Sequence, residues 1–355
     1  MIRTDHAHLY VSALTHPGMT GKNNEDSYGV SSFITSLDDT TPSLLAVVAD
    51  GIGGHRAGEI AAEVAVDTIS KYVSESNGRK PLEVLKSAVQ AASQTILKQA
   101  EKDKDRLGMG ATCAVAWVIE DRLYTASVGD SRIYLVRAGS IQQITVDHSW
   151  VQEAIDKGLL TPVDARNHPN VHVIRRYLGS TKPPEVDFRL RLDGNEKDAK
   201  MRANQGLPLA PGDVVLLCSD GLTDLVADEE ILNIIRASSD LDTAARLLVT
   251  QANARGGRDN ITVVLMGFPQ KWVQLQKKRS CLPWLVGGML ALLAMAALAF
   301  AAVWYYLQPG WLPRFPWPAA TDTPPALVVT NTPGPTPTVT PLVLPTPIKI
   351  GTPVP

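Results

Sequence analysis

Carboxylate side chains recur in this sequence beside short apolar runs, a placement that could build a metal site. Asp50, Asp130 and Asp220 each follow such a run within two residues, Asp259 comes just before one, and Glu25 and Asp26 follow a glycine-containing loop. Strand ends are rigid and can aim carboxylates at one point, and adjacent glycines let a backbone carbonyl approach a ligand. Crowded carboxylates repel one another unless a cation neutralises them, and hard oxygen ligands select Mg²⁺ or Mn²⁺.

Simpler interpretations exist for each of these residues. A turn explains any single Asp-Gly pair, but five such places, four of them against apolar runs, favour a shared site. The histidines do not favour zinc, because His148, His168 and His172 are scattered, and we expect surface or capping roles for them. Cys113, Cys218 and Cys281 form no C-x-x-C motif, so neither a zinc-thiolate site nor a disulfide framework is expected.

The elements that must position these carboxylates can be read from apolar periodicity. Short connections between neighbouring strand patterns favour antiparallel pairing, and the segregation of strand groups from helix groups favours an α+β layered sandwich. We expect residues 160–210 to be rich in loops. The predicted strands are 44–49, 111–119, 123–128, 133–136, 214–218 and 261–266, and the predicted helices are 59–74, 81–102, 149–157, 228–237 and 243–254.

Charge divides the chain into distinct parts. Beyond residue 270 lie six of the 34 Lys and Arg residues and one of the 36 Asp and Glu residues, which leaves a net charge of −7 on residues 1–270. That balance argues against a nucleic-acid-binding domain. Residues 271–281 form a basic linker that contains Lys271, Lys277, Lys278 and Arg279, and no charged residue occurs from 280 to 313.

A membrane span is predicted at residues 282–307, because about 20 apolar residues suffice to cross a bilayer as a helix. Cationic flanks stay in the cytoplasm, so we expect residues 1–270 to form a cytoplasmic catalytic domain of a single-pass cell-membrane protein. Residues 308–355 hold 14 of the 25 prolines, interleaved with threonine, and are expected to form a disordered extracytoplasmic tail.

Several motifs, in order, closely resemble those of the metal-dependent serine/threonine protein phosphatases of the type 2C, or PPM, family, in their bacterial form. The resemblance covers about residues 8–267 and implies a sandwich of two antiparallel sheets flanked by helices. The motifs are Asn24-Glu25-Asp26, Asp50-Gly51-Ile52-Gly53-Gly54-His55, Val128-Gly129-Asp130-Ser131-Arg132, Ser219-Asp220-Gly221-Leu222 and Gly257-Arg258-Asp259-Asn260.

The resemblance also implies roles for individual residues. Asp50 would bridge two Mn²⁺ or Mg²⁺ ions, the Gly51 carbonyl would help to hold one, Asp220 and Asp259 would complete the first site and Glu25 the second. Asp130 matches the position that supports a weakly held third ion. Asp26 would orient the attacking water, which bridges the two ions and hydrolyses phosphoserine or phosphothreonine without a covalent intermediate. The stretch from Asp147 to Gly179 resembles the flap of bacterial members.

Two positions depart from the family pattern. An arginine that grips the substrate phosphate often lies four residues before the metal-binding acid, but here that position is Gly21, followed by Lys22. We expect Lys22, or secondly Arg176, to contact the phosphate instead. Ile52 occupies the position where animal members carry a histidine that is proposed as general acid.

The resulting hypothesis is a membrane-anchored phosphatase of cytosolic phosphoproteins, with a membrane serine/threonine kinase as its counterpart. The alternative is a non-catalytic membrane receptor or scaffold that binds metal and phosphoprotein. The missing arginine motivates the alternative, whereas the complete set of metal positions argues against it.

Overall fold

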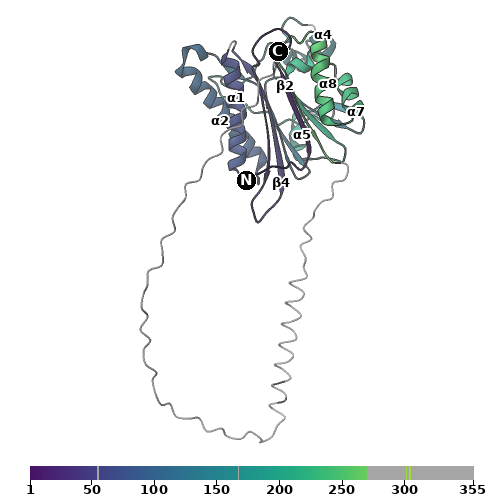
Figure 1. The fold of residues 1–355 in the computed structure, drawn as a ribbon. Coiled ribbons are helices and arrows are strands. Elements are labelled where there is room, and N and C mark those ends of the chain that lie inside the picture. The colour runs from purple at the N-terminus through teal and green to yellow at the C-terminus, as the bar shows by residue number, and fades with distance from the viewer. Residues whose placement is uncertain (54–55, 167, 270–300, 302–303, 305–355) are drawn as a thin grey trace, which may run out of the picture. The chain divides into compact units, whose positions relative to one another are not determined.

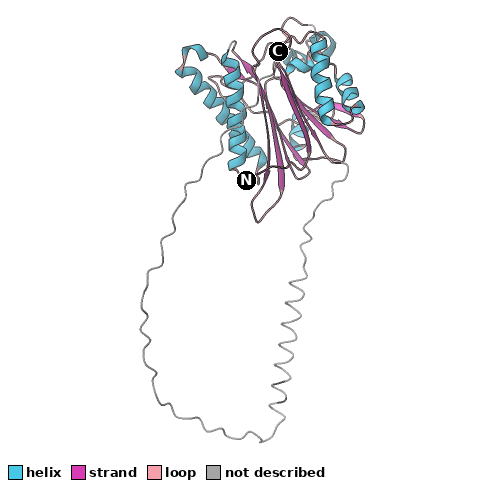
Figure 2. Cartoon of the chain, viewed as in Figure 1, coloured by secondary structure: helices cyan, strands magenta, loops and turns pink. Residues whose placement is uncertain are grey.

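Two antiparallel sheets pack face to face in the computed structural model, with helices on both outer sides (Figures 1 and 2). The structure describes residues 1–53, 56–166 and 168–269, together with residues 301 and 304. The chain divides into two units, Met1–Leu275 and Gln276–Pro355, and the fold below is that of the first. The α+β layered sandwich predicted from the sequence is confirmed.

The first sheet has β4 near its centre. In spatial order it contains β1 (Ile2–Thr4), β3 (Asp26–Ile34), β4 (Pro42–Ile52), β6 (Cys113–Ile119), β7 (Arg122–Val128) and β10 (Leu207–Pro208), while β5 (Gly110–Ala111) pairs with the end of β4. Side chains alternate along β4 between two buried faces, which explains why its sequence is continuously apolar. Leu45 and Val47 face the helices, whereas Leu44 and Ala46 face the second sheet.

The second sheet joins the two ends of the domain sequence. Its order is β2 (Tyr10–His16), β12 (Ile261–Gly267), β11 (Val214–Cys218), β8 (Arg132–Arg137) and β9 (Ser140–Gln143). Every residue of β2 is paired with a residue of β12, from Tyr10 opposite Gly267 to His16 opposite Ile261. Buried side chains form three clusters. One lies between the first sheet and its helices, one between the two sheets, and one between the second sheet and its helices.

Long helices cover the outer faces. The first sheet is covered by α1 (Arg56–Glu75) and α2 (Pro81–Lys102), and the second by α7 (Asp228–Ala237) and α8 (Leu241–Ala254) (Figure 1). Pro81 at the first turn favours the start of α2, and the Asp240 side chain accepts a hydrogen bond from the Thr243 amide at the start of α8. Shorter helices are η1 (Lys104–Arg106), α3 (Trp150–Asp156), α4 (Pro162–Arg166), α5 (Asp198–Ala203) and α6 (Asp220–Thr223).

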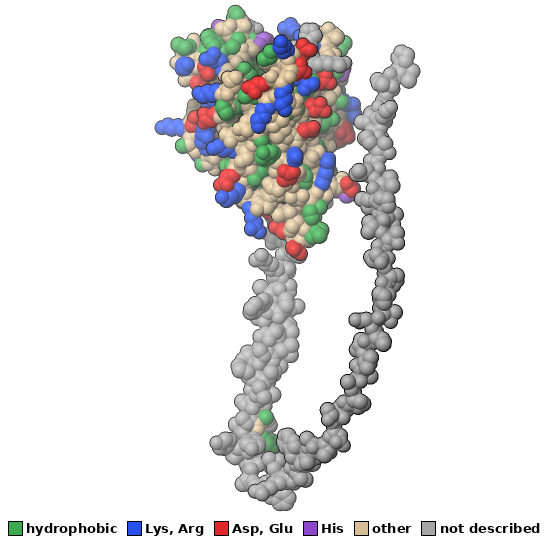
Figure 3. Space-filling view, turned by 90° about the vertical axis from the view of Figure 1, so that its left-hand side faces the viewer, with side chains coloured by type: hydrophobic (Ala, Val, Ile, Leu, Met, Phe, Trp, Pro, Cys, Tyr) green, Lys and Arg blue, Asp and Glu red, His purple; other side chains and the backbone are tan. Residues whose placement is uncertain are grey.

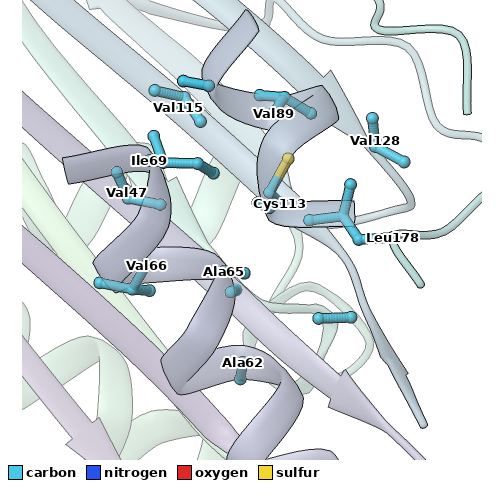
Figure 4. Close-up of a cluster of buried hydrophobic side chains, with 14 of the residues drawn as sticks. Val47, Ala62, Ala65, Val66, Ile69, Val89, Cys113, Val115, Val128 and Leu178 are labelled. Carbon is cyan, nitrogen blue, oxygen red and sulfur yellow. The ribbon is translucent and has the colours of Figure 1, made fainter. Parts of the chain in front are cut away.

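Cys113 lies in the core between α2 and the first sheet, beside Val89 and Val128 (Figure 4). Cys218 is equally buried in the core of the second sheet, and burial raises the pKa of both thiols. Both are therefore structural side chains, as their apolar neighbours in the sequence indicate.

The surface carries charges of both signs. On the face shown in Figure 3, Lys and Arg side chains are interspersed with Asp and Glu.

Among the described residues, no helix is long and apolar enough to cross a membrane. Of the span predicted at 282–307, only positions 301 and 304 belong to that described set, and both are helical. The predicted linker and tail lie outside the described residues.

Candidate metal centre

The predicted metal-binding acids lie where the two sheets meet. Asp26 and Asp50 are opposite each other on β3 and β4 of the first sheet. The Ser219 hydroxyl, from the end of β11 in the second sheet, donates a 2.7 Å hydrogen bond to Asp26 Oδ2. Ser219 is itself fixed, because its backbone amide donates to the Thr262 carbonyl and its hydroxyl accepts from the Thr262 amide.

Thr112 forms two hydrogen bonds with the Asp50 backbone. The Asp50 amide donates to Thr112 Oγ1 over 3.0 Å, and the Thr112 amide donates to the Asp50 carbonyl over 2.8 Å. The same hydroxyl lies 2.7 Å from Ser131 Oγ, next to Asp130. Thr112 thus links the acid at the end of β4 to the loop between β7 and β8 that carries Asp130.

Two glycines allow Glu25 to approach β4 and α1. The Gly51 amide donates to the Glu25 carbonyl over 3.1 Å, and a Cβ at Gly51 would collide with the Gly58 carbonyl. A Cβ at Gly58 would lie 2.8 Å from the Glu25 carboxyl. The packing therefore requires glycine at both positions if the Glu25 carboxylate is to lie beside the Gly51 backbone.

Asn260 connects the loops that carry Glu25 and Asp259. Its Oδ1 accepts a 2.7 Å hydrogen bond from the Glu25 amide, and its Nδ2 donates to the carbonyls of Pro17 and Asn23. A Cβ at Gly221 would collide with the Asn260 carbonyl, so the first turn of α6, which begins at Asp220, packs directly on this loop. Asn260 positions metal-binding candidates from both sheets.

Burial and mutual repulsion raise the pKa values of the central acids. Burial, together with the charges of neighbouring acids, raises the pKa of Asp50 and Asp220 well above its usual range. Burial is also the main cause that raises the pKa of Asp26 and of Asp130 to about 6. Within the described part of the chain, Asp26 Oδ1 and Asp130 Oδ1 are buried without a hydrogen-bond partner.

These properties fit a centre for divalent metal ions. A cluster of buried and half-buried carboxylates with unused oxygen atoms needs positive charge to remain ionised at neutral pH. Its donors are all oxygen atoms, which suit Mg²⁺ and Mn²⁺. The predicted ligands Glu25, Asp50, Asp220 and Asp259 line two cavities that share Asp50, Gly51 and Asp259.

We name the two cavities by their walls. The loop-side cavity has a volume of about 500 Å³ and is lined by Lys22, Asn23, Glu25, Asp50, Gly51, Asp259 and Asn260. The flap-side cavity has a volume of about 380 Å³ and is lined by Asp50, Gly51, Ile52, His172, Ile174, Asp220, Gly221, Asp224, Leu225, Arg258 and Asp259.

The two predicted phosphate contacts differ in their surroundings. Lys22 is exposed and lines the loop-side cavity. Arg176 lines neither cavity, and its Nη1 donates to the Glu185 carbonyl over 3.1 Å and lies 3.3 Å from His148 Nε2. Gly21 has a φ of +73°, so replacing it with the arginine of other family members would strain the backbone.

Of the two histidines near the flap, His148 differs from the surface or capping role expected from the sequence, whereas His172 is exposed as expected. His148 is buried: its Nδ1 accepts from the Gly129 amide, and its Nε2 lies 3.1 Å from Asp187 Oδ2, so it fixes the base of the flap beside Asp130. His172 lines the flap-side cavity, and its Nδ1 lies 3.5 Å from Asp224 Oδ2. No local pattern marks either histidine, because each acts with an acid far away in the sequence.

Comparison with known proteins follows this geometry. The family model "Protein phosphatase 2C" matches residues 19–253. The serine/threonine phosphatase stp of Listeria welshimeri is 34% identical over 262 residues, which are 73% of this chain and 95% of that protein. The serine/threonine protein phosphatase PstP of Mycobacterium tuberculosis is 35% identical over 258 residues, which are 72% of this chain but 44% of that protein.

Solved structures agree. The Streptococcus agalactiae serine/threonine phosphatase superposes with a TM-score of 0.63 at 31% identity, and the match covers 73% of this chain and 98% of that one. The catalytic domain of PstP in complex with two manganese ions superposes with a TM-score of 0.59 at 32% identity, and the match covers 73% of this chain and 97% of that one.

The raised pKa values predict how pH affects the metal-free protein. The ordinary pKa of Asp26 and Asp130 is 3.8, so between about pH 4 and pH 6 the folded state keeps protons that the unfolded state has released. Stability is therefore lost as the pH rises through about 6, and Asp50 and Asp220 extend the loss to higher pH. In thermal unfolding with EDTA at pH 5 to 8, we expect Asp50→Asn to raise the Tm at pH 8 by roughly 2–6 °C.

The same variant should lose the rise in Tm that Mn²⁺ gives the wild type, because the central ligand is weakened. Asp67→Asn, at an exposed position on α1, is the matched control. It should change neither the metal-free Tm at pH 8 nor the rise in Tm that Mn²⁺ gives. If Asp50→Asn leaves the metal-free Tm at pH 8 unchanged, repulsion at this centre does not destabilise the fold.

Proposed function

The chain belongs to the protein phosphatase 2C family of metal-dependent serine/threonine protein phosphatases, and from this premise we propose how its own residues bind the metal ions and the phosphate. The enzyme hydrolyses phosphoserine and phosphothreonine in proteins with a binuclear metal centre. The observation that carries the proposal is the cluster of buried and half-buried carboxylates, in which burial, together with the charges of neighbouring acids, raises the pKa of Asp50 and Asp220.

In the proposed centre, Asp50 would help to hold both divalent ions and the Gly51 carbonyl would help to hold one of them. Asp220 and Asp259 would complete the first site, and Glu25 would complete the second. The shared lining of the two cavities by Asp50, Gly51 and Asp259 supports this arrangement. Asp130, with its unpartnered Oδ1, is proposed as the ligand of a third, more weakly held ion.

Asp26 is proposed to orient the attacking water. Its Oδ2 is occupied by the Ser219 hydroxyl, whereas its Oδ1 is free to accept a hydrogen bond. Two divalent ions held here would supply a more acidic water for the attack and would offset negative charge on the phosphate oxygens. Asp26 would hold the direction of attack through Oδ1.

Either Mn²⁺ or Mg²⁺ suits the oxygen donors, and the PstP structure with two manganese ions supports Mn²⁺ for the assay. We expect the purified chain to release phosphate from a phosphothreonine peptide in Mn²⁺ and to lose this activity in EDTA. Asp220→Asn should lower kcat/KM roughly 100-fold or more, because it removes a ligand charge.

Asp242→Asn, on the exposed surface of α8, is the control and should keep wild-type turnover. A wild-type chain that binds the phosphopeptide in Mn²⁺ without hydrolysing it would instead support a receptor or scaffold role. Near wild-type turnover by Asp220→Asn at low Mn²⁺ would disprove the ligand assignment.

Lys22 is the first candidate for a phosphate contact, because its exposed side chain lines the same cavity as Glu25 and Asp50. We expect Lys22→Ala to raise the KM for a phosphopeptide several-fold and Lys22→Arg to raise it much less, because the second variant keeps the charge. Steady-state kinetics with both variants measure this. If Lys22→Ala leaves kcat/KM unchanged, Arg176 becomes the residue to test.

Membrane anchoring is proposed from the sequence of residues 271–355. We propose a basic linker at 271–281, a span at 282–307 and an extracytoplasmic tail at 308–355, with the domain of residues 1–270 in the cytoplasm as a single-pass cell-membrane protein. A membrane serine/threonine kinase is the proposed counterpart, since a shared bilayer raises the effective concentration of the two enzymes.

Protease treatment of intact cells or spheroplasts tests this orientation. External protease should remove the Pro/Thr-rich tail and spare residues 1–270, which antibodies against each end would detect. Lysed cells are the control, because there the protease reaches both sides. Digestion of residues 1–270 in intact cells would reverse the proposed orientation.

A further inference from the structure

Arg258 is a cationic side chain in the flap-side cavity, whose lining contains four aspartates. It is exposed and lines the flap-side cavity together with Asp50, Asp220 and Asp259. Within the described part of the chain, its guanidinium takes part in no hydrogen bond or ion pair. The other basic residue of this cavity, His172, lies 3.5 Å from Asp224. Arg258 is therefore available to a ligand that enters the cavity.

The backbone that carries Arg258 is fixed on both sides. Gly256 and Gly257 have φ values of +112° and +46°, and the Gly257 amide donates to the Ala252 carbonyl at the end of α8. The Gly257 carbonyl accepts a 2.7 Å hydrogen bond from the Met19 amide. A Cβ at position 257 would lie 2.5 Å from Asn253 Oδ1. The turn is thus preorganised, which lowers the entropy that Arg258 loses when it binds a ligand.

Charge balance indicates which ligand this is. The four carboxylates proposed as ligands, of Glu25, Asp50, Asp220 and Asp259, balance the charge of two divalent ions. A phosphate monoester brings a further charge of about −1.5 to −2 at neutral pH. Lys22 offers one positive charge from the loop-side cavity, and Arg258 offers a second from the flap-side cavity. The two cavities share Asp50, Gly51 and Asp259, so each cation lines a cavity that reaches the proposed metal ligands.

We propose that Arg258 binds the phosphate group of the phosphoprotein substrate, an inference that rests on the phosphatase function proposed above. A guanidinium binds two phosphate oxygens through parallel hydrogen bonds, which a lysine ammonium cannot do. The left-handed backbone at Gly21 disfavours an arginine there, and Arg258 supplies the guanidinium from the opposite end of the domain sequence. Arg258 is thereby a substrate-binding residue of the flap-side cavity.

The test uses the full chain in Mn²⁺ with a phosphothreonine peptide. Arg258→Gln should raise KM roughly ten- to a hundredfold, with a smaller change in kcat, because it removes charge-assisted hydrogen bonds to the substrate. Arg258→Lys should recover only part of this loss. Arg246→Gln, on the exposed face of α8, is the matched control and should keep wild-type kinetics.

Calorimetric titration with inorganic phosphate gives a readout that is independent of turnover. Its Kd should rise in Arg258→Gln by a factor similar to that of KM, while the Mn²⁺ concentration for half-maximal activity stays unchanged. An unchanged KM and phosphate Kd would overturn the proposal, as would a shift in the Mn²⁺ requirement alone, which would mean that Arg258 only balances the carboxylates. A wild-type chain without turnover would instead disprove the phosphatase function itself.

Discussion

The burial and crowding of carboxylates in one place is the constraint on which this domain depends. Asp26 and Asp50 lie opposite each other on neighbouring strands, and Asp220 joins them from the second sheet. Without positive charge, burial and repulsion raise the pKa values of these groups, so the fold must hold them together against a cost that metal ions relieve. The surrounding hydrogen bonds of Thr112, Ser219 and Asn260 are directed at the backbones and oxygen atoms of this cluster.

Those three residues also explain why a sandwich suits this chemistry. Each sheet supplies part of the acidic cluster, and Ser219 and Asn260 connect the parts across the junction. The first sheet contributes Asp26 and Asp50 through adjacent strands, and the second contributes Asp220 and Asp259 through segments that flank β11 and β12. Both sheets pack on helices and on each other, so three buried cores hold in place the segments that carry these acids.

The sequence predicts the layered fold well, because strands that are buried on both faces are continuous apolar runs, whereas the metal-binding roles of the acids stay a prediction. The sequence pattern ends the predicted strand at residue 49 and places Asp50 just after it. In the structure β4 extends to Ile52, so Asp50 lies inside the strand and pairs with Asp26. The strands β2 and β3 are missed because their faces are only half buried and their polar residues break the apolar pattern. The stretch expected to be loop-rich contains α4, α5 and β10, which are too short to give a periodic signal.

Contacts between distant segments are what sequence patterns cannot reveal. His148 depends on Asp187, 39 positions further along the chain, and His172 meets Asp224 only because the flap folds back over the body. Arg258 can be recognised as a candidate ligand-binding residue only because the structure shows that it lines a cavity. The strain expected from a side chain at Gly21 is known only from the backbone angle φ. Neither property can be predicted from composition or residue spacing.

The pairing of β2 with β12 has a consequence for folding during synthesis on the ribosome. β2 ends at His16, and its only sheet neighbour among the described strands begins at Ile261. At about 5–20 residues per second, the early strand waits on the order of 10–50 s for its partner to be synthesised. For most of that interval the nascent chain carries Glu25, Asp26 and Asp50 without Asp220, and Asp259 is made only just before β12 begins at Ile261. Catalytic competence therefore arises only at the end of translation of the domain, so an unfinished chain is held inactive by topology alone.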